Sequence, residues 1–529
     1  MQFDGKPIMV RPQRLLREGL LASAQRYPNK EALIVEGEAF TYMQLVEASL
    51  KLAAALKDRG LQRGDRVVVF LDNSWPCVVS IYGILLAGGV FVVANPQTKA
   101  EKLAFVLNDC EASFLISDRR LENIYSSALK KVTKKVGMII AGVRSDKQLI
   151  TSREESFEDL VEFGKPLLTP VDLIPNDLAA LIYTSGSTGM PKGVMQTHQA
   201  MVFAAWSLIE YQRLTDNDRI MLVMPMAFDY GLYQLLMAMK LGATLIVEKS
   251  FAFPQDIYAR INEQQATVMP GVPTIFATMI ASYNKKAFCF SSITRVTNTA
   301  ANLAKELIPY LHQIFPNALI YSMYGLTECK RVSYLEPELI NEKPESVGKA
   351  IPGTEVYLLT TEGNPVSPGE KGILYVRGPH IMAGYWNQPQ LTDYMLIPGK
   401  LPGERVLCTH DWFKMDDEGF LYFVSRTDDI IKTRGEKVSP LEVERTLAQI
   451  KGIEAAAVIG VEDEILGQAI RAFVVVDPAL KLDAKKIKQL CLAMLENYMV
   501  PRDVMFLDKL PQNANGKIDK QSLAQLPVN

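Results

Sequence analysis

The stretch from Tyr183 to Gly193 reads Tyr-Thr-Ser-Gly-Ser-Thr-Gly-Met-Pro-Lys-Gly and is suited to binding a polyphosphate. Its glycines let the backbone curl so that several N–H groups point at one place, and its hydroxyls add donors. Lys192 adds a positive charge. The spacing is not that of a Walker loop, because Pro191 and Gly193 stand where glycine and Ser or Thr are needed. A flexible Gly/Ser linker is the alternative, and the buried-strand pattern directly before the loop disfavours it.

Five further segments follow the loop in a fixed order: Tyr324–Glu328, Thr409–Asp411, Ser425–Asp429, Gly435–Pro440 and Asn515–Lys517. Together with the loop they resemble the adenylate-forming superfamily. That superfamily includes acyl-CoA synthetases, amino-acid adenylation domains and luciferases. Each is a weak signal alone, but their order over nearly the whole chain is specific. The resemblance implies that a carboxylate attacks the α-phosphate of ATP and that a thiol then displaces AMP.

The same resemblance implies a site for ATP and Mg²⁺. Thr184 and Lys192 would hold the departing phosphates, and Glu328 would ligate Mg²⁺, a cation that prefers oxygen. Lys517 would enter from the C-terminal domain and bridge the carboxylate and the phosphate; an ordinary solvated lysine is the alternative. The other residues that the resemblance assigns to the nucleotide are Ser185, Gly186, Ser187, Thr188, Gly189, Ala300, Ala301, Asn302, Tyr324, Gly325, Thr327, Asp411, Phe423, Arg426 and Lys432.

Some of these assignments have alternatives. Tyr324 would stack on adenine or be an ordinary core tyrosine, and Asp428 would be a hinge or a polar turn. His410 stands where the family has glycine, so its ring would crowd the nucleotide, add a contact or point to solvent, and we favour solvent. Ala300-Ala301-Asn302 replaces a glycine-containing segment that contacts adenine in the family.

Asp229 is the residue that discriminates between classes of acid. In amino-acid adenylation domains, which the segment Pro225–Gln234 resembles, an Asp after Phe pairs with the substrate α-ammonium. A buried carboxylate needs a cationic partner, so Asp229 favours an amino or imino acid over a plain fatty acid. The alternative is that Asp229 is the N-cap of a helix beginning at Tyr230.

The acid pocket is expected to be small and partly apolar. A cyclic amino acid fits it, and the chain resembles free-standing prolyl–carrier-protein ligases. The predicted function is therefore activation of L-proline and its transfer to the phosphopantetheine of a separate carrier protein; the alternative is an acyl-CoA ligase. Lys330-Arg331 would instead favour an acid with an extra acidic group. The residues expected to line this pocket are Tyr230, Tyr233, Thr297, Thr299 and Met323.

Alternating helical and strand-like segments must position these residues. The sequence predicts helices at 45–59 and 103–108 and strands at 66–71 and 114–117. This alternation predicts an α/β fold with parallel-rich sheets. The uncharged run 78–94 is slightly short for a membrane span and is split by Gly88-Gly89, so a helix, a turn and a buried strand are expected.

The C-terminal half shows a different pattern. Residues 351–377 are expected to form a small antiparallel unit. After Arg426 we expect a helix at 440–450, strands at 454–460 and 469–476, and a helix at 484–497. These predictions place a large N-terminal adenylation domain at 1–425 and a small, mobile α+β domain at 426–529.

The composition of the chain disfavours several other classes of protein. The chain has 529 residues, 48% of them hydrophobic, and a net charge of −2, so we expect no attraction to nucleic acid or membrane. Its six cysteines form no C-x-x-C pair, which disfavours zinc and disulfides and fits a cytoplasmic enzyme. A luciferase-like oxidase and a degenerate nucleotide-binding scaffold are the remaining alternatives, and the full set of motif residues argues against a scaffold.

Overall fold

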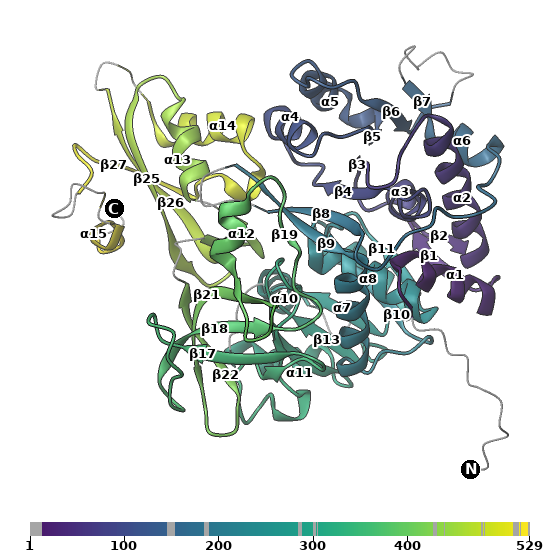
Figure 1. The fold of residues 1–529 in the computed structure, drawn as a ribbon. Helices are drawn as coiled ribbons and strands as arrows, with labels where there is room; N and C mark the ends of the chain where they lie inside the picture. The colour runs from purple at the N-terminus through teal and green to yellow at the C-terminus, as the bar shows by residue number, and fades with distance from the viewer. Residues whose placement is uncertain are drawn as a thin grey trace.

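The computed structural model describes residues 13–144, 154–184, 190–283, 288–299, 303, 305–426, 431–438, 440–477, 480, 482–511, 518 and 520–526. Figure 1 shows two mixed sheets with their helices on the right and centre, and a separate sheet with helices at the upper left formed by the end of the chain. No helix of these residues is long and apolar enough to cross a bilayer. All six cysteines are free thiols.

The first sheet has nine strands and is parallel from β14 to β1, with antiparallel strands at both edges. Its parallel strands are nearly continuous runs of buried apolar residues, as expected of strands covered on both faces. Its strands, in spatial order, are β16 (Lys349–Ala350), β15 (Ser333–Tyr334), β14 (Leu319–Tyr324), β13 (Arg295–Asn298), β12 (Val268–Gly271), β10 (Arg219–Leu222), β11 (Thr244–Val247), β1 (Glu31–Val35) and β2 (Glu38–Thr41).

The second sheet has eight strands and is parallel from β8 to β7. β8 and β9 form an antiparallel pair in which Thr184 lies opposite Lys192, so the loop of 185–191 connects two paired strands. Its strands, in spatial order, are β19 (Gly384–Tyr385), β9 (Lys192–Thr197), β8 (Leu178–Thr184), β4 (Val90–Ala94), β3 (Arg66–Phe70), β5 (Phe114–Asp118), β6 (Gly137–Ala141) and β7 (Glu154–Ser156).

Helices cover these two sheets. Ser74 begins α3 by accepting a hydrogen bond from the backbone N–H of Cys77, and Gly88 follows its end with a φ of 82°, which glycine adopts without strain. One large hydrophobic cluster includes side chains of both sheets. The helices are α1 (Leu16–Arg26), α2 (Tyr42–Asp58), α3 (Trp75–Leu86), α4 (Ala100–Asp109), α5 (Glu122–Leu129), α6 (Phe157–Phe163), α7 (His198–Tyr211), α8 (Asp229–Leu241), α9 (Pro254–Glu263), α10 (Pro273–Ser282) and α11 (Ile308–Ile314).

A third, antiparallel sheet lies below the C-terminal part in Figure 1. It includes the antiparallel unit expected at 351–377 and carries the Thr409–Asp411 segment on a long strand. Its elements are β17 (Glu355–Leu359), β18 (Lys371–Arg377), β21 (Arg405–Met415), β20 (Leu396–Pro398) and β22 (Leu421–Arg426), with α12 (Pro389–Met395) beside it.

The C-terminal part has its own sheet and two hydrophobic clusters that consist only of residues from 431 onward. We refer to residues 431–526 as the C-terminal part. Its elements are β24 (Glu436–Val438), β23 (Ile431–Thr433), β26 (Gly467–Val476), β25 (Ile453–Asp463), β27 (Asp503–Phe506), α13 (Pro440–Ala448), α14 (Ala484–Met494) and α15 (Lys520–Ala524).

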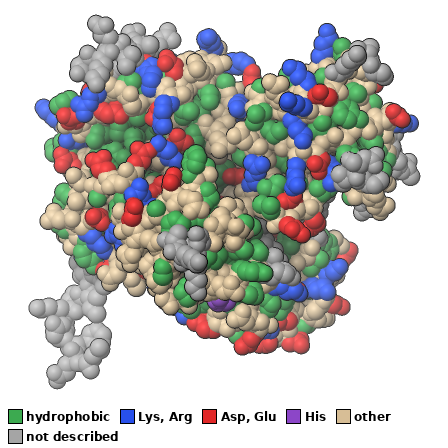
Figure 2. Space-filling view, turned by 180° about the vertical axis from the view of Figure 1, so that it is seen from behind, with side chains coloured by type: hydrophobic (Ala, Val, Ile, Leu, Met, Phe, Trp, Pro, Cys, Tyr) green, Lys and Arg blue, Asp and Glu red, His purple; other side chains and the backbone are tan. Residues whose placement is uncertain are grey.

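The fold class predicted from the sequence is confirmed. The uncharged run 78–94 is most of α3, a glycine turn and β4. The elements expected at 45–59, 66–71, 103–108 and 114–117 are α2, β3, α4 and β5. Figure 2, seen from behind, shows Lys and Arg interspersed with Asp and Glu on that face, in keeping with the small net charge.

Candidate active site

A cavity of about 610 Å³ lies where strand ends of both N-terminal sheets meet the C-terminal part. Ala94 ends β4, Thr184 ends β8, and Thr299 and Gly325 come just after β13 and β14. All four residues line the cavity. Ligands of open α/β sheets bind outside the carboxyl ends of the strands, so this position is the expected one for a substrate site.

Thr184 and Lys192 flank the glycine-rich loop at the mouth of the β8–β9 pair. The Thr184 hydroxyl is buried and makes no hydrogen bond within the described residues, which leaves a donor available at the cavity wall. The loop residues between them that the sequence assigns to phosphate, Ser185, Gly186, Ser187, Thr188 and Gly189, lie outside the described residues.

Glu328 is buried and shares one oxygen with two neighbours. Tyr385 donates its hydroxyl hydrogen to Oε1 of Glu328 at 2.5 Å, and Lys192 Nζ lies 3.2 Å from the same oxygen. Lys192 also donates to the Tyr385 hydroxyl at 2.8 Å. Sequence reasoning missed Tyr385, because it comes from a two-residue strand in no recognised motif.

This carboxylate fits Mg²⁺, which is usually held by one or two carboxylates and completed by phosphate oxygens and water. No group of three or more His, Cys, Asp or Glu side chains in the described chain could hold a metal. A magnesium ion at Glu328 would therefore depend on the phosphates of the nucleotide for its other ligands.

Several residues that the sequence predicts to bind the nucleoside lie around Asp411 on β21. This carboxylate is buried and accepts the hydroxyl hydrogen of Tyr324 at 2.5 Å. The Tyr324 ring meets Phe413 edge-on at 4.8 Å, and Phe423 packs against Phe413 in turn. Lys432 Nζ lies 4.8 Å from the centroid of the Phe423 ring.

Gly325 and Thr327 line the cavity directly after Tyr324. A Cβ on Gly325 would lie 2.3 Å from the carbonyl oxygen of Lys330, so the close approach of these two backbones requires glycine. The backbone of Arg426 lies opposite Asp411 in β22. Ala300, Ala301, Asn302, Asp428 and Lys517 lie outside the described residues.

His410 does not line the cavity. Its φ is 54°, in the left-handed region that favours glycine, and its ring stacks on Tyr394 with centroids 4.1 Å apart. The family glycine at this position therefore has a conformational reason, and the histidine side chain is directed to a half-exposed tyrosine of α12 instead of the nucleotide. We expected this side chain to point to solvent; the ring instead packs on Tyr394.

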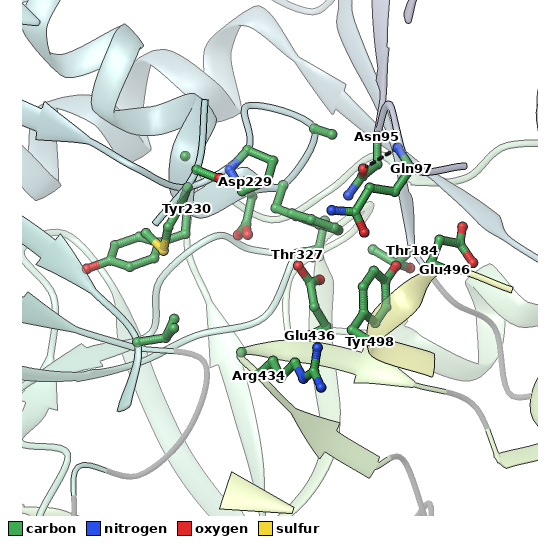
Figure 3. Close-up of a pocket in the computed structure, with 18 of the residues that line it drawn as sticks. Asn95, Gln97, Thr184, Asp229, Tyr230, Thr327, Arg434, Glu436, Glu496 and Tyr498 are labelled. Carbon is green, nitrogen blue, oxygen red and sulfur yellow. Dashed lines mark hydrogen bonds between the residues drawn. The ribbon is translucent and has the colours of Figure 1, made fainter. Parts of the chain in front are cut away.

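Asp229 lies on the cavity wall at the first residue of α8, whose N-cap is Phe228. The helix thus begins one residue earlier than the capping hypothesis requires. Asp229 Oδ2 instead lies 3.6 Å from Nζ of Lys330. Figure 3 shows the Asp229 carboxylate directed into the pocket and the Tyr230 hydroxyl directed away from it.

The other residues expected at the acid occupy two layers. Tyr230 and Thr299 line the cavity, and Tyr230 donates to the carbonyl oxygen of Thr297 at 2.7 Å. Tyr233, Thr297 and Met323 are buried behind this wall and do not line it.

The C-terminal part supplies the opposite wall with side chains that sequence reasoning missed, namely Glu436, Glu496 and Tyr498 (Figure 3). Glu436 belongs to a recognised segment, but the other two carry no local signal. The pKa of Glu436 is raised to about 8: burial is the largest cause, the nearby Glu496 and Asp229 add to it, and Lys102 opposes them. Glu436 is therefore largely protonated at neutral pH.

Lys102 connects the two parts of the molecule. It lies on α4, and its Nζ is 3.1 Å from Glu442 of α13 and 3.2 Å from Glu496. Burial lowers the pKa of Lys102, but the two carboxylates outweigh this effect and leave the pKa raised. We call Lys102, Glu442 and Glu496 the bridging triad.

Two family models match the chain. The model described as AMP-binding enzyme matches residues 20–386, and the model of the AMP-binding enzyme C-terminal domain matches residues 442–517. The chain belongs to the AMP-binding enzyme family. A long-chain-fatty-acid–CoA ligase of Bacillus subtilis is 32% identical over 97% of this chain and 95% of its own.

Solved structures of the AMP-binding enzyme family agree with the fold. An o-succinylbenzoate CoA synthetase from Bacillus subtilis, bound to a product analogue, has a TM-score of 0.82 at 27% identity and covers 96% of this chain and 98% of its own. The structure of VinN has a TM-score of 0.69 at 33% identity and covers 78% of this chain and all of its own. The predicted superfamily and enzyme class are thus confirmed: the protein is an AMP-forming acid–thiol ligase of a family that uses ATP and Mg²⁺.

Proposed function

We propose that this AMP-binding enzyme adenylates a small amino or imino acid and transfers it to the phosphopantetheine thiol of a separate carrier protein. The observation that carries the proposal is the position of Asp229, a carboxylate directed into the cavity at the acid end of the site. L-Proline is the first candidate. The alternative is an acyl-CoA ligase for a small carboxylic acid.

Asp229 can bind the amino group of a substrate because its ion-pair partner within the protein, Lys330, holds it only weakly. The Lys330 ammonium lies 3.6 Å away, beyond ordinary hydrogen-bond distance. The pKa of Lys330 is lowered to about 7: burial is the largest cause and Arg331 adds to it, while Asp229 opposes them. Lys330 can therefore lose its proton near neutral pH, and Asp229 is then free to pair with an ammonium group of the substrate.

In the proposed mechanism the chain aligns two anions and neutralises their charge. Thr184 and Lys192 hold the phosphates of ATP, and Asp411 accepts the ribose hydroxyls. The acid carboxylate attacks the α-phosphorus, pyrophosphate leaves, and the thiol then attacks the acyl carbon with release of AMP. Magnesium, bound at Glu328, would neutralise phosphate charge. Lys517 would assist adenylation only.

The test compares wild type with Asp229→Asn, which keeps the shape and removes the charge. Pyrophosphate release is measured with L-proline, cyclopentanecarboxylate, and a panel of amino, aryl and aliphatic acids. Loss of one member of a buried ion pair costs about 3–5 kcal/mol, so activity with the preferred amino acid should fall at least about a hundredfold. Activity with its des-amino analogue should change little. Equal losses for both acids would favour the acyl-CoA ligase.

The acceptor is tested with two thiols that differ in one moiety. Phosphopantetheine and CoA share the reactive arm, and only CoA carries the adenosine 3′-phosphate end. A carrier-protein ligase should use the two thiols with similar kcat/KM, because it recognises the missing protein rather than the nucleotide. A kcat/KM at least tenfold higher for CoA would contradict transfer to a carrier protein.

A further inference from the structure

Arg331 is a buried cation at the acid end of the cavity, and two of its three side-chain nitrogens make no hydrogen bond within the described residues. Its side chain is 1% exposed, and it lines the cavity beside Asp229 and Tyr230. Nη1 donates to the hydroxyl of Thr299. Within the described residues, Nε and Nη2 make no hydrogen bond.

The two nitrogens of Arg331 without a hydrogen bond, Nε and Nη2, lie on one edge of the guanidinium group. Nε–H and the adjacent N–H of Nη2 are parallel, and this edge matches the two oxygens of a carboxylate. The Tyr211 hydroxyl donates to Sδ of Met323 at 2.8 Å. Burial raises the pKa of Tyr211, and its contact with the Arg331 side chain opposes this effect, so Tyr211 is a neutral neighbour of Arg331 and not an anionic one. In the described chain, no carboxylate forms an ion pair with Arg331.

Charge at this end of the cavity is also unbalanced. Lys330 is 3% exposed, packs over the rings of Tyr230 and Tyr233, and has Asp229 as its anionic neighbour. When Lys330 loses its proton and Asp229 pairs with the substrate ammonium, Arg331 remains a buried cation with no anionic partner among the described residues. A buried charge without a partner costs several kcal/mol, so an additional anion at this place would stabilise the site.

We infer that the acid which this enzyme activates carries a second carboxylate, and that Arg331 binds it through Nε and Nη2. This inference rests on the proposed function and narrows it: an acid with an amino group at Asp229 and a second carboxylate at Arg331 is a small amino dicarboxylic acid. The amino group of L-proline would pair with Asp229, but L-proline has no second carboxylate to pair with Arg331.

The first experiment needs only the wild-type enzyme and substrates that differ in one group. Pyrophosphate release is measured for L-aspartate against L-asparagine and for L-glutamate against L-glutamine, since each amide keeps the shape and removes the charge. A site built for a polar group rejects an analogue that lacks it strongly, so the acidic member of one pair should exceed its amide at least about a hundredfold in kcat/KM. If neither acid exceeds its amide, including the case of no activity, the inference is overturned.

Succinate and L-proline separate this inference from the proposed function. Activity with succinate equal to that with L-aspartate, and none with L-asparagine, would support Arg331 and refute the amino group. Activity with L-proline and L-asparagine equal to that with L-aspartate would refute the second carboxylate and leave amino-acid activation intact.

A variant then assigns the selectivity to one residue. Arg331→Met keeps the length and the apolar stem, and it should reduce the aspartate-to-asparagine ratio to near 1. Arg295→Met is the matched control, because Arg295 pairs with Asp218 and does not line the cavity; it should keep the wild-type ratio. A folded Arg331→Met enzyme that keeps its preference for the acid would contradict the assignment.

Discussion

The bridging triad gives a prediction about the two half-reactions. Lys102 is the only one of its three members in the N-terminal part, so Lys102→Met removes two ion pairs across the contact at once. Glu436, Glu496 and Tyr498 of the C-terminal part line the cavity in the arrangement that the triad stabilises. We propose that this arrangement serves thioester formation and that a different one brings Lys517 to the acid for adenylation.

The size of the effect follows from the geometry. At 3.1 and 3.2 Å each pair is worth about 5 kcal/mol at an effective dielectric constant of about 20, before the opposing cost of desolvation. Removing one partner of a buried pair costs about 3–5 kcal/mol net. The Lys102 side chain is 21% exposed, and burial already raises the pKa of Glu442, so Glu442 can take up a proton when Lys102 is removed. We therefore expect the loss of Lys102 to destabilise this arrangement by about 2–3 kcal/mol, or roughly 30- to 150-fold in its equilibrium constant.

The assay measures each half-reaction separately. Acid-dependent pyrophosphate release should be unchanged or faster in Lys102→Met, while thioester formation from supplied acyl-adenylate should fall by that factor. Lys131→Met is the control, because Lys131 pairs on the surface with Glu101 of the same α4 region. It should change neither rate by more than about twofold. If Lys102→Met leaves the ratio of the two rates as in the wild type, the triad does not control the arrangement.

Three further predictions concern single side chains. Lys517→Ala should reduce pyrophosphate release by several powers of ten and leave thioester formation from supplied adenylate nearly normal; equal losses would refute separate roles for the domain positions. The pKa of Glu436 is raised to about 8 in the described arrangement, so Glu436 keeps a proton there that it would lose if the C-terminal part moved away and exposed it to water. The stability of the described arrangement therefore falls as pH rises from about 4.5 to about 8. Glu436→Gln should remove this dependence and flatten the pH profile of thioester formation. The pKa of Lys330 is lowered to about 7, so its charge is lost as pH rises through 7 and Asp229 is freed for the substrate ammonium; KM for an amino acid should fall above that pH in wild type and change little with pH in Lys330→Met.

Much of the site could be predicted because its residues belong to short segments. Thr184 ends β8 and Glu328 lies in a turn, where local sequence determines the backbone, and Asp411 lies within the long strand β21. The elements of the parallel sheets were also predictable, since buried strands such as β4 are continuous apolar runs.

Other parts depend on contacts that local sequence does not encode. Lys102 and Glu442 are 340 residues apart and meet only when the two parts of the chain pack together. Tyr233 and Met323 have the residue types of a pocket wall, but the packing of α8 and β14 places them one layer behind it. The direction of the His410 side chain depends on its positive φ angle and on stacking against Tyr394. Neither feature can be predicted from the presence of histidine in place of glycine.

The bridging triad also limits how this enzyme can be recombined with its relatives. A chimera that joins the N-terminal part of this chain to the C-terminal part of another ligase keeps every recognised motif. It keeps the partners of Lys102 only if the donor has carboxylates at the positions of Glu442 and Glu496, in two separate segments of the sequence. Compatibility between the halves of such hybrids is therefore decided by these two positions at the contact, and choosing donors by them should recover more active combinations than choosing by overall identity.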